Sequence, residues 1–144
     1  MVAAGIVAAM HEMVDNVYRH SGQWKSGIVG YRWSKGEVEY VVADSGIGIL
    51  ASLRQHPNYV NISDHAAALQ TALSDSESRF GRASGHGNGF RTVFLSLATL
   101  NGSLRFRSGD HSLEVNGVTP SLAKASIFQR LPLAGFVVTV TCRT

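Results

Sequence analysis

The chain has 144 residues, of which 44% are hydrophobic and 16% charged, so it can bury one sizeable core and we expect a single domain over residues 1–144. Its formal net charge is +3, but the thirteen Lys and Arg residues form no dense run, so the charge pattern does not indicate a nucleic-acid partner. It has neither an apolar run long enough to cross a membrane nor a basic leader, and we expect a soluble, cytoplasmic protein with no membrane contact.

Residues 3–20 have the apolar spacing of an amphipathic helix. With successive residues placed about 100° apart, one stripe is expected to face the core, and it comprises Ile6, Met10, Met13, Val14 and Val17. Glu12, Asn16 and His20 form a row on the flank of this stripe. We therefore expect this row at the border between core and solvent, where it can line a cleft.

A β-hairpin is predicted after this helix. The segments 27–33 and 37–43 are rich in β-branched and aromatic residues, and the polar break between them, residues 34–36, favours a short turn. The second strand ends at Asp44.

The middle of the chain has a different pattern of residue types. We expect a short turn near residues 50–54, a break at Pro57, and then a helix of Ala and Leu with Ser63 as its N-cap. Residues 75–89 are rich in Gly and Ser and predict a mobile loop. A further helix is predicted at 90–100, closed by a C-cap at Asn101-Gly102.

The last part of the chain predicts three or four strands. They lie at about 103–107, 111–115, 125–130 and 135–142, and turn residues separate them at 108–110, 116–117 and 132. Cys142, the one cysteine, is expected to be a small buried apolar residue. The order of elements predicts an α+β fold, a two-layer sandwich with helices packed on one face of a mixed, mostly antiparallel sheet.

The first candidate site residues follow the predicted hairpin. Asp44 ends a valine-rich strand, where a carboxylate is costly to bury unless something satisfies it. Gly46 and Gly48 let the backbone turn sharply and let a flat ligand come close. An ordinary Asp-Ser-Gly turn is the alternative interpretation.

A second glycine cluster precedes the predicted helix at 90–100. It comprises Gly85, Gly87, Asn88 and Gly89, and free N–H groups in the first turn of a helix bind anions, above all phosphates. Arg79 and Arg82 lie just upstream and could reach a terminal phosphate. The alternatives are a flexible glycine hinge and two solvated loop charges.

Together with these two glycine clusters, Glu12 and Asn16 can be interpreted as parts of one site. An amide oxygen such as that of Asn16 is a suitable ligand for Mg²⁺, which shares its coordination shell with phosphates and waters. A carboxylate one turn away can take a proton from an attacking water or hydroxyl. Taken singly, without the two glycine clusters, each residue is better explained as part of a polar helix flank.

The ordered set of motifs resembles a known superfamily. E-x-x-x-N on the first helix, D-x-G-x-G after a strand and G-x-G-x-G at a helix start resemble the N box and two glycine boxes of the ATPases that include gyrase, heat-shock chaperones, histidine kinases and mismatch-repair proteins. Their shared domain is called the Bergerat fold. The resemblance covers about residues 5–142 and implies that the insertion at about 49–84 is the ATP lid.

The resemblance implies a role for each matching position. Asn16 would bind Mg²⁺, Glu12 would be the general base, and Asp44 would accept a hydrogen bond from the adenine amino group. Gly46 and Gly48 would lie beneath the adenine, and the second cluster, Gly85, Gly87 and Gly89, would hold the phosphates.

The sequence departs from the family pattern near its end. Phe136 stands where many relatives have Gly followed by Thr, whose hydroxyl supports the adenine site. Thr139 or Thr141 could supply that hydroxyl, and the sequence leaves both possibilities open.

Three functions are compatible with these residues. The first is an ATP-binding domain that uses Mg·ATP for hydrolysis or to phosphorylate a protein partner in signalling. The second is a nucleotide-sensing interaction module that binds ATP or ADP and a regulatory partner with negligible turnover. The third is nucleic-acid binding through the basic surface, which would depend steeply on salt. No pattern in the sequence specifies an oligomeric state.

Overall fold

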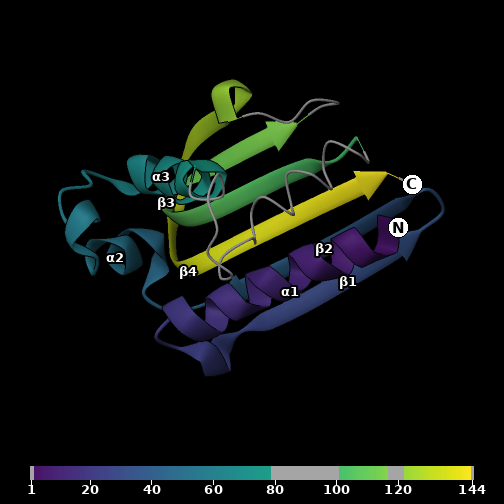
Figure 1. Ribbon diagram of the computed structural model, residues 1–144, viewed down its shortest axis with the longest axis horizontal. Coiled ribbons are helices and arrows are strands. Elements are labelled where there is room, and N and C mark those ends of the chain that lie inside the picture. The colour runs from purple at the N-terminus through teal and green to yellow at the C-terminus, as the bar shows by residue number, and fades with distance from the viewer. Residues whose placement is uncertain (1, 79–100, 117–121, 144) are drawn as a thin grey trace.

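The computed structural model describes residues 2–78, 101–116 and 122–143 (Figure 1). Its helices are α1 (Val2–His20), α2 (Gly48–Arg54) and α3 (His65–Ser78), and its strands are β1 (Ile28–Ser34), β2 (Glu37–Asp44), β3 (Ser103–Asn116) and β4 (Ser126–Arg143). The expected α+β class is confirmed. Among the described residues, no helix has both the length and the apolar composition that a membrane span requires.

The four described strands form one sheet in the order β1-β2-β4-β3. Every neighbouring pair is antiparallel, so the described sheet is antiparallel and not mixed as we expected. β2 and β3 do run in the same direction, but β4 lies between them and opposes both, so no parallel neighbours arise. β1 and β2 form the predicted hairpin, with Ser34 opposite Glu37.

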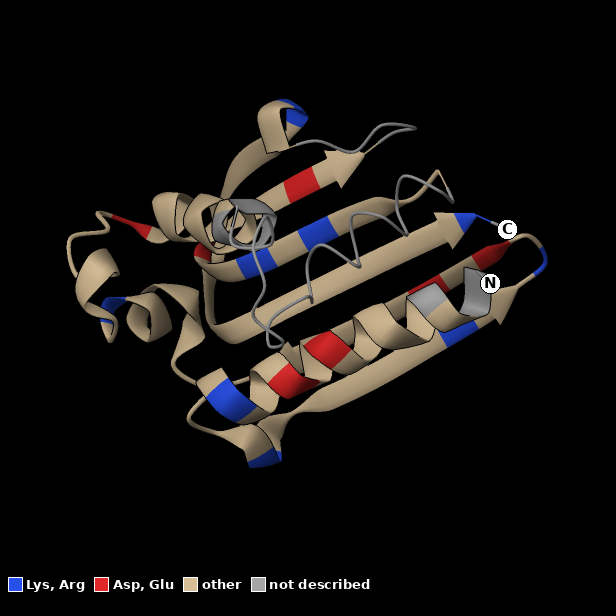
Figure 2. Ribbon diagram, viewed as in Figure 1, with Lys and Arg blue, Asp and Glu red and all other residues tan. Residues whose placement is uncertain are grey.

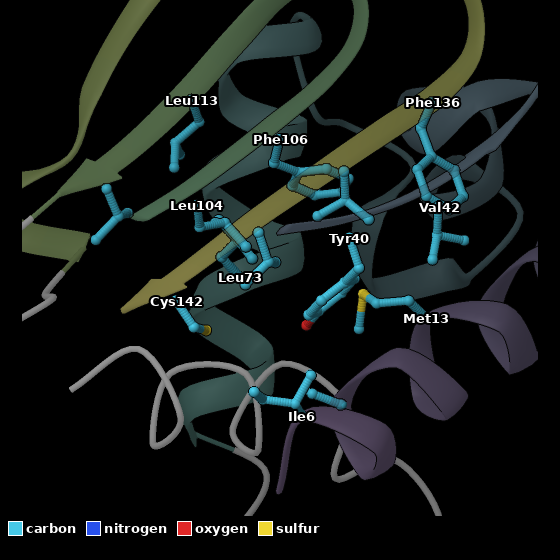
Figure 3. Close-up of a cluster of buried hydrophobic side chains, with 14 of the residues drawn as sticks. Ile6, Met13, Tyr40, Val42, Leu73, Leu104, Phe106, Leu113, Phe136 and Cys142 are labelled. Atoms are coloured by element: carbon cyan, nitrogen blue, oxygen red, sulfur yellow. The ribbon is translucent and has the colours of Figure 1, made fainter. Parts of the chain in front are cut away.

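The helices cover one face of this sheet (Figure 1), and the core lies between the two layers. Alternate residues of β2 are buried, as the period of two in a strand with one covered face requires. Side chains from α1, α3 and the strands β2, β3 and β4 meet in this core, as Figure 3 shows for Ile6, Met13, Tyr40, Val42, Leu73, Leu104, Phe106 and Cys142. Cys142 is fully buried, as predicted.

Helix α1 confirms the predicted element but corrects the predicted stripe. Ile6, Met13 and Val17 are buried, and Met10 packs partly against the core. Val14 is 37% exposed, so its assignment to the core-facing stripe is wrong. Val14 lies about 100° from Met13 around the helix, which carries its side chain past the edge of the buried face, and the smaller Ala9 is buried in its place.

The last part of the chain forms two long strands rather than three or four. Ser108-Gly109-Asp110 was expected to be a turn, but it lies within β3 at a register irregularity. Across it, the pairing passes from Gly109 opposite Leu133 to His111 opposite Gln129, so β4 carries extra residues there, and Pro132 is among them. Turn-forming residues can also make a β-bulge, and a bulge tolerates a proline that cannot donate to the ladder.

Helix α3 begins and ends differently from the prediction. The main-chain N–H of Ala67 donates a 2.8 Å hydrogen bond to Oδ1 of Asp64, so Asp64 caps the helix and Ser63, the predicted cap, does not. The helix continues to Ser78, so the first residues of the expected 75–89 loop are helical. The rest of that loop and the helix predicted at 90–100 lie outside the described residues.

The insertion at about 49–84 contains a firmly packed part. Ala68, Leu69 and Leu73 of α3 are fully buried, and α3 packs against β3. A helix that contributes three side chains to the core cannot move independently of the sheet. The buried part of α3 therefore cannot belong to the mobile lid that the resemblance implies for this insertion.

Candidate functional site

Asp44 lies at the end of β2 on the helix-covered face, opposite Phe136 of β4. Its Oδ1 accepts a 2.7 Å hydrogen bond from the main-chain N–H of Gly46. Its Oδ2 is buried and has no hydrogen-bond partner within the described part of the chain. Burial raises the pKa of the Asp44 carboxyl, and the Gly46 hydrogen bond opposes that shift. A residue only 6% exposed thus presents one unsatisfied acceptor oxygen.

The loop after Asp44 is held against the end of α1. The N–H of Ile47 donates to the carbonyl of Ser21 at 2.9 Å, and the N–H of Ser45 donates to Oγ of Ser26 at 3.0 Å. A Cβ atom at Gly46 would collide with the Ser21 carbonyl. This close approach explains why position 46 requires glycine, and it fixes the predicted D-x-G-x-G loop beside the first helix.

The other side of the same loop is tied to β3 and β4. The hydroxyl of Ser108 donates a 2.7 Å hydrogen bond to the carbonyl of Gly135 and accepts a 3.0 Å bond from the N–H of Ile49. Gly135 has a φ of +72°, and a Cβ there would collide with the carbonyl oxygen of Asp44. Ser108 and Gly135 therefore position the loop of Gly46 and Gly48 from the side opposite α1.

Glu12 and Asn16 lie one turn apart on α1, and both are partly exposed, as expected for the border of the buried stripe. Neither side chain makes a hydrogen bond or ion pair with another described residue, whereas the side chain of the neighbouring Asp15 pairs with Arg19 at 2.8 Å. Asn16 precedes Ser21, the docking point of the Asp44 loop, by about 7.5 Å along the helix axis. The structure therefore brings the first two predicted motifs to the same end of α1.

Arg79, Arg82 and the second glycine cluster, Gly85, Gly87, Asn88 and Gly89, lie outside the described residues.

Ser108 and Gly135 were missed by the sequence analysis. Thr139 and Thr141, considered there as hydroxyl donors, pair with Val41 and Glu39, so they lie on the sheet face opposite to Asp44. The hydroxyl at the site belongs to Ser108. In the sequence, nothing marks Gly135 except its position shortly after Pro132 and Leu133. Ser108 has the residue type and neighbours of an ordinary turn residue.

Phe136, the departure from the family pattern, has a structural role. Its ring is buried and packs edge to face on Phe106, with the ring centroids 5.9 Å apart. The neighbouring Gly135, and not Phe136, provides the close backbone approach to Asp44. The phenyl ring of Phe136 therefore belongs to the core.

The donor atoms near the end of α1 suit one kind of metal ion. No group of three His, Cys, Asp or Glu residues among the described positions could hold a metal. Mg²⁺ does not require such a group, because it commonly takes one or two protein oxygens and completes its shell with phosphates and waters. The amide oxygen of Asn16 and the carboxylate of Glu12 are hard oxygen donors of that type.

Neither a scan against models of known protein families nor a search of curated proteins finds a match to this chain.

Proposed function

We propose that this chain is an ATP-binding domain of the histidine-kinase-like type, with a Bergerat fold, that uses Mg·ATP for hydrolysis or for phosphorylation of a protein partner. The observation that supports it best is the buried Oδ2 of Asp44, which has no partner in the described residues. A buried, unsatisfied carboxylate oxygen costs free energy, and a ligand that donates a hydrogen bond removes that cost. The exocyclic amino group of adenine is such a donor.

The surroundings of Asp44 suit a flat base. Gly46 and Gly135 bring main chain rather than side chains next to the carboxylate, and Gly46 N–H already holds Oδ1 in place. The acceptor is therefore oriented before any ligand arrives, which lowers the entropic cost of binding. In this proposal the adenine lies on the Gly46–Gly48 loop.

The phosphate side of the proposed site extends along α1. Asn16 would hold Mg²⁺ through its amide oxygen. The ion would neutralise negative charge on the phosphates while the terminal phosphoryl group is transferred. Glu12, one turn away, would accept the proton of the attacking water or hydroxyl. Arg79, Arg82 and the cluster at 85–89 remain the sequence-based candidates for phosphate contacts.

The order of elements supports the fold part of the proposal. A first helix carries Glu12 and Asn16, an antiparallel strand ends in Asp44, and further helices precede two long antiparallel strands. The helices of the described residues lie on one face of the sheet (Figure 1). This is the arrangement that the resemblance to the Bergerat fold implies.

Calorimetric titration with ADP and a non-hydrolysable ATP analogue, with and without Mg²⁺, tests the binding proposal. We expect Mg²⁺ to tighten wild-type binding of the ATP analogue at least about tenfold, and to tighten binding to Asn16→Ala far less. Asp15→Ala is the matched control, because Asp15 is adjacent on α1 but pairs with Arg19, and it should keep the wild-type response. Equal magnesium responses in Asn16→Ala and wild type would contradict the role of Asn16.

Turnover measurements separate the enzyme from the nucleotide-sensing module. If Glu12 is the general base, Glu12→Ala should lower the rate of ATP cleavage by about a hundredfold or more while keeping ATP affinity. Full rate in this variant would remove Glu12 from that role. Tight ATP binding with negligible wild-type turnover, in the presence of candidate protein acceptors, would favour the sensing module.

A further inference from the structure

The outer strand β1 leaves large apolar side chains uncovered. Val29, Tyr31 and Trp33 pair with Val42, Tyr40 and Val38, so they point to the same face of the sheet as the core. Yet Tyr31 is 78% and Trp33 66% exposed. Helix α1 packs on β2 and does not cover the row beyond it, so three core-facing positions of β1 remain open.

A second set of exposed apolar residues lies next to this row. Val7, Val14 and Tyr18 are exposed on one flank of α1, at the spacing of one helix face. Tyr18 contacts Trp24, which precedes β1, with ring centroids 5.7 Å apart, so this flank faces the β1 side. It lies about 160° around the helix from Asn16. We call the combined set the β1-edge surface: Val7, Val14, Tyr18, Trp24, Val29, Tyr31 and Trp33.

The backbone edge of β1 is also unprotected. In the described part of the sheet, β1 pairs with β2 alone. Exposed edges are normally blocked by proline, by lysine or by a bulge, and β1 has none of these over Ile28–Ser34. Its one charge, Arg32, is paired with Glu37 and Glu39 of β2 at 3.4 and 3.1 Å, and Figure 2 shows how sparse the charge along β1 is.

We propose that two copies of this chain associate through the β1-edge surface, with their β1 strands paired antiparallel across a two-fold axis at Tyr31. Lys35 and Gly36 form the two-residue turn of the hairpin, and Ser34 and Glu37 flank this turn. The two residues that flank a two-residue turn form a hydrogen-bonded pair. By alternation, the N–H and C=O groups of Val29, Tyr31 and Trp33 point away from β2. A two-fold axis at Tyr31 pairs all three residues.

This register is also the best for the side chains. Tyr31 lies opposite Tyr31, and Trp33 of each copy lies opposite Val29 of the other, so the apolar row continues across the axis. Moving the axis to Arg32 would set two guanidinium groups directly opposite each other, which is destabilising. Moving it to Gly30 would set Trp33 opposite Gly27, beyond the end of the strand.

The area available is close to what a stable dimer needs. The four aromatic side chains of the β1-edge surface are each more than half exposed, and together they offer on the order of 500 Å². A standard interface buries about 800 Å² on each partner. The paired backbone edges and the exposed valines of α1 supply the remainder, so a second copy of the chain can cover this surface.

Disulfide trapping tests the proposed register. Opposite residues of a hydrogen-bonded antiparallel pair have Cα atoms about 5.5 Å apart, within the range that a disulfide spans. Tyr31→Cys should therefore form a covalent dimer on mild oxidation. Val29→Cys should not, because its copies would be about 13 Å apart, and the native Cys142 is buried. Failure of Tyr31→Cys to cross-link, or equal cross-linking of Val29→Cys, would overturn this register.

Sedimentation analysis tests the association without cysteine chemistry. We expect the wild type to sediment as a dimer at about 100 µM, and Tyr31→Lys to weaken association at least about a hundredfold, because two ammonium groups would meet at the axis. Leu131→Lys is the matched control, since Leu131 is 83% exposed on β4, and it should remain dimeric. A monomeric wild type, or a dimeric Tyr31→Lys, would refute the proposal. The proposed nucleotide binding is measured separately and does not affect either outcome.

Discussion

Asp44 and Gly135 lie so close together at the ends of β2 and β4 that a side chain at position 135 would collide with the main chain of Asp44. Gly135 also has a φ of +72°, a conformation that favours glycine. The contact brings a bare backbone next to a buried carboxylate that keeps one oxygen without a partner in the described residues. A position that is costly for the free protein is a candidate for ligand binding.

Asp44→Asn separates the binding interpretation from the structural-turn interpretation. Asparagine keeps an oxygen for the N–H of Gly46 but carries no charge to bury. We expect the free protein to be as stable as wild type or up to about 2 kcal/mol more stable, with adenine-nucleotide affinity at least about tenfold weaker. Thermal unfolding and calorimetric titration measure the two effects. A clear loss of stability would instead indicate that Asp44 serves the turn.

The pH dependence should have opposite signs for stability and for binding. Burial raises the pKa of Asp44 above its ordinary value of 3.8, so the folded state binds the proton first as pH falls. The destabilisation from the buried charge is therefore fully present above the folded pKa and is relieved as pH falls through it. Binding should weaken over the same range, because the protonated carboxyl loses an acceptor.

Adenosine is the suitable probe for this pH effect, since it has no phosphate that titrates. In the wild type its affinity should fall as the pH is lowered from neutral through the raised pKa of Asp44, and in Asp44→Asn it should stay flat. A wild-type affinity that does not change with acidification would mean that Asp44 does not contact the base.

Ser108→Ala should weaken both the fold and the site. It removes the hydroxyl that links Ile49 N–H to the Gly135 carbonyl, and we expect a loss of about 1–3 kcal/mol in the free energy of unfolding together with weaker nucleotide binding. Ser112→Ala is the control, because Ser112 is equally buried on β3 but, within the described residues, its hydroxyl is bonded to the side chain of Arg130 and not to the main chain. Urea unfolding of both variants provides the comparison. Equal losses would show that the Ser108 link has no special role.

Local patterns predicted the elements that depend on local sequence. The helical spacing of residues 3–20 and the polar break of the hairpin give α1, β1 and β2 nearly as they occur. Asp44 was identified because a carboxylate at the end of a valine-rich strand is costly to bury unless a partner satisfies it. The borderline position of Glu12 and Asn16 also follows from helix geometry alone.

Long-range placement accounts for what the sequence did not predict. Ser108 reaches Ile49 across 59 residues of chain, and it does so only because β4 lies between β2 and β3. No periodicity specifies that strand order. The bulge at Gly109 was mistaken for a turn because the same residue types form both, and the exposure of Val14 depends on how α1 lies across the sheet.

The most direct test of the central claim is an amide-resolved NMR titration of the labelled protein. If Asp44 and Asn16 border one nucleotide site, adenosine alone should shift the amide signals of Gly46, Ile47 and Gly48. The side-chain amide of Asn16 should shift only when Mg²⁺ and an ATP analogue are both present. Saturable shifts in this pattern are the predicted result. Shifts confined to other parts of the chain, or no saturable shift at Gly46 and Asn16, would contradict the account.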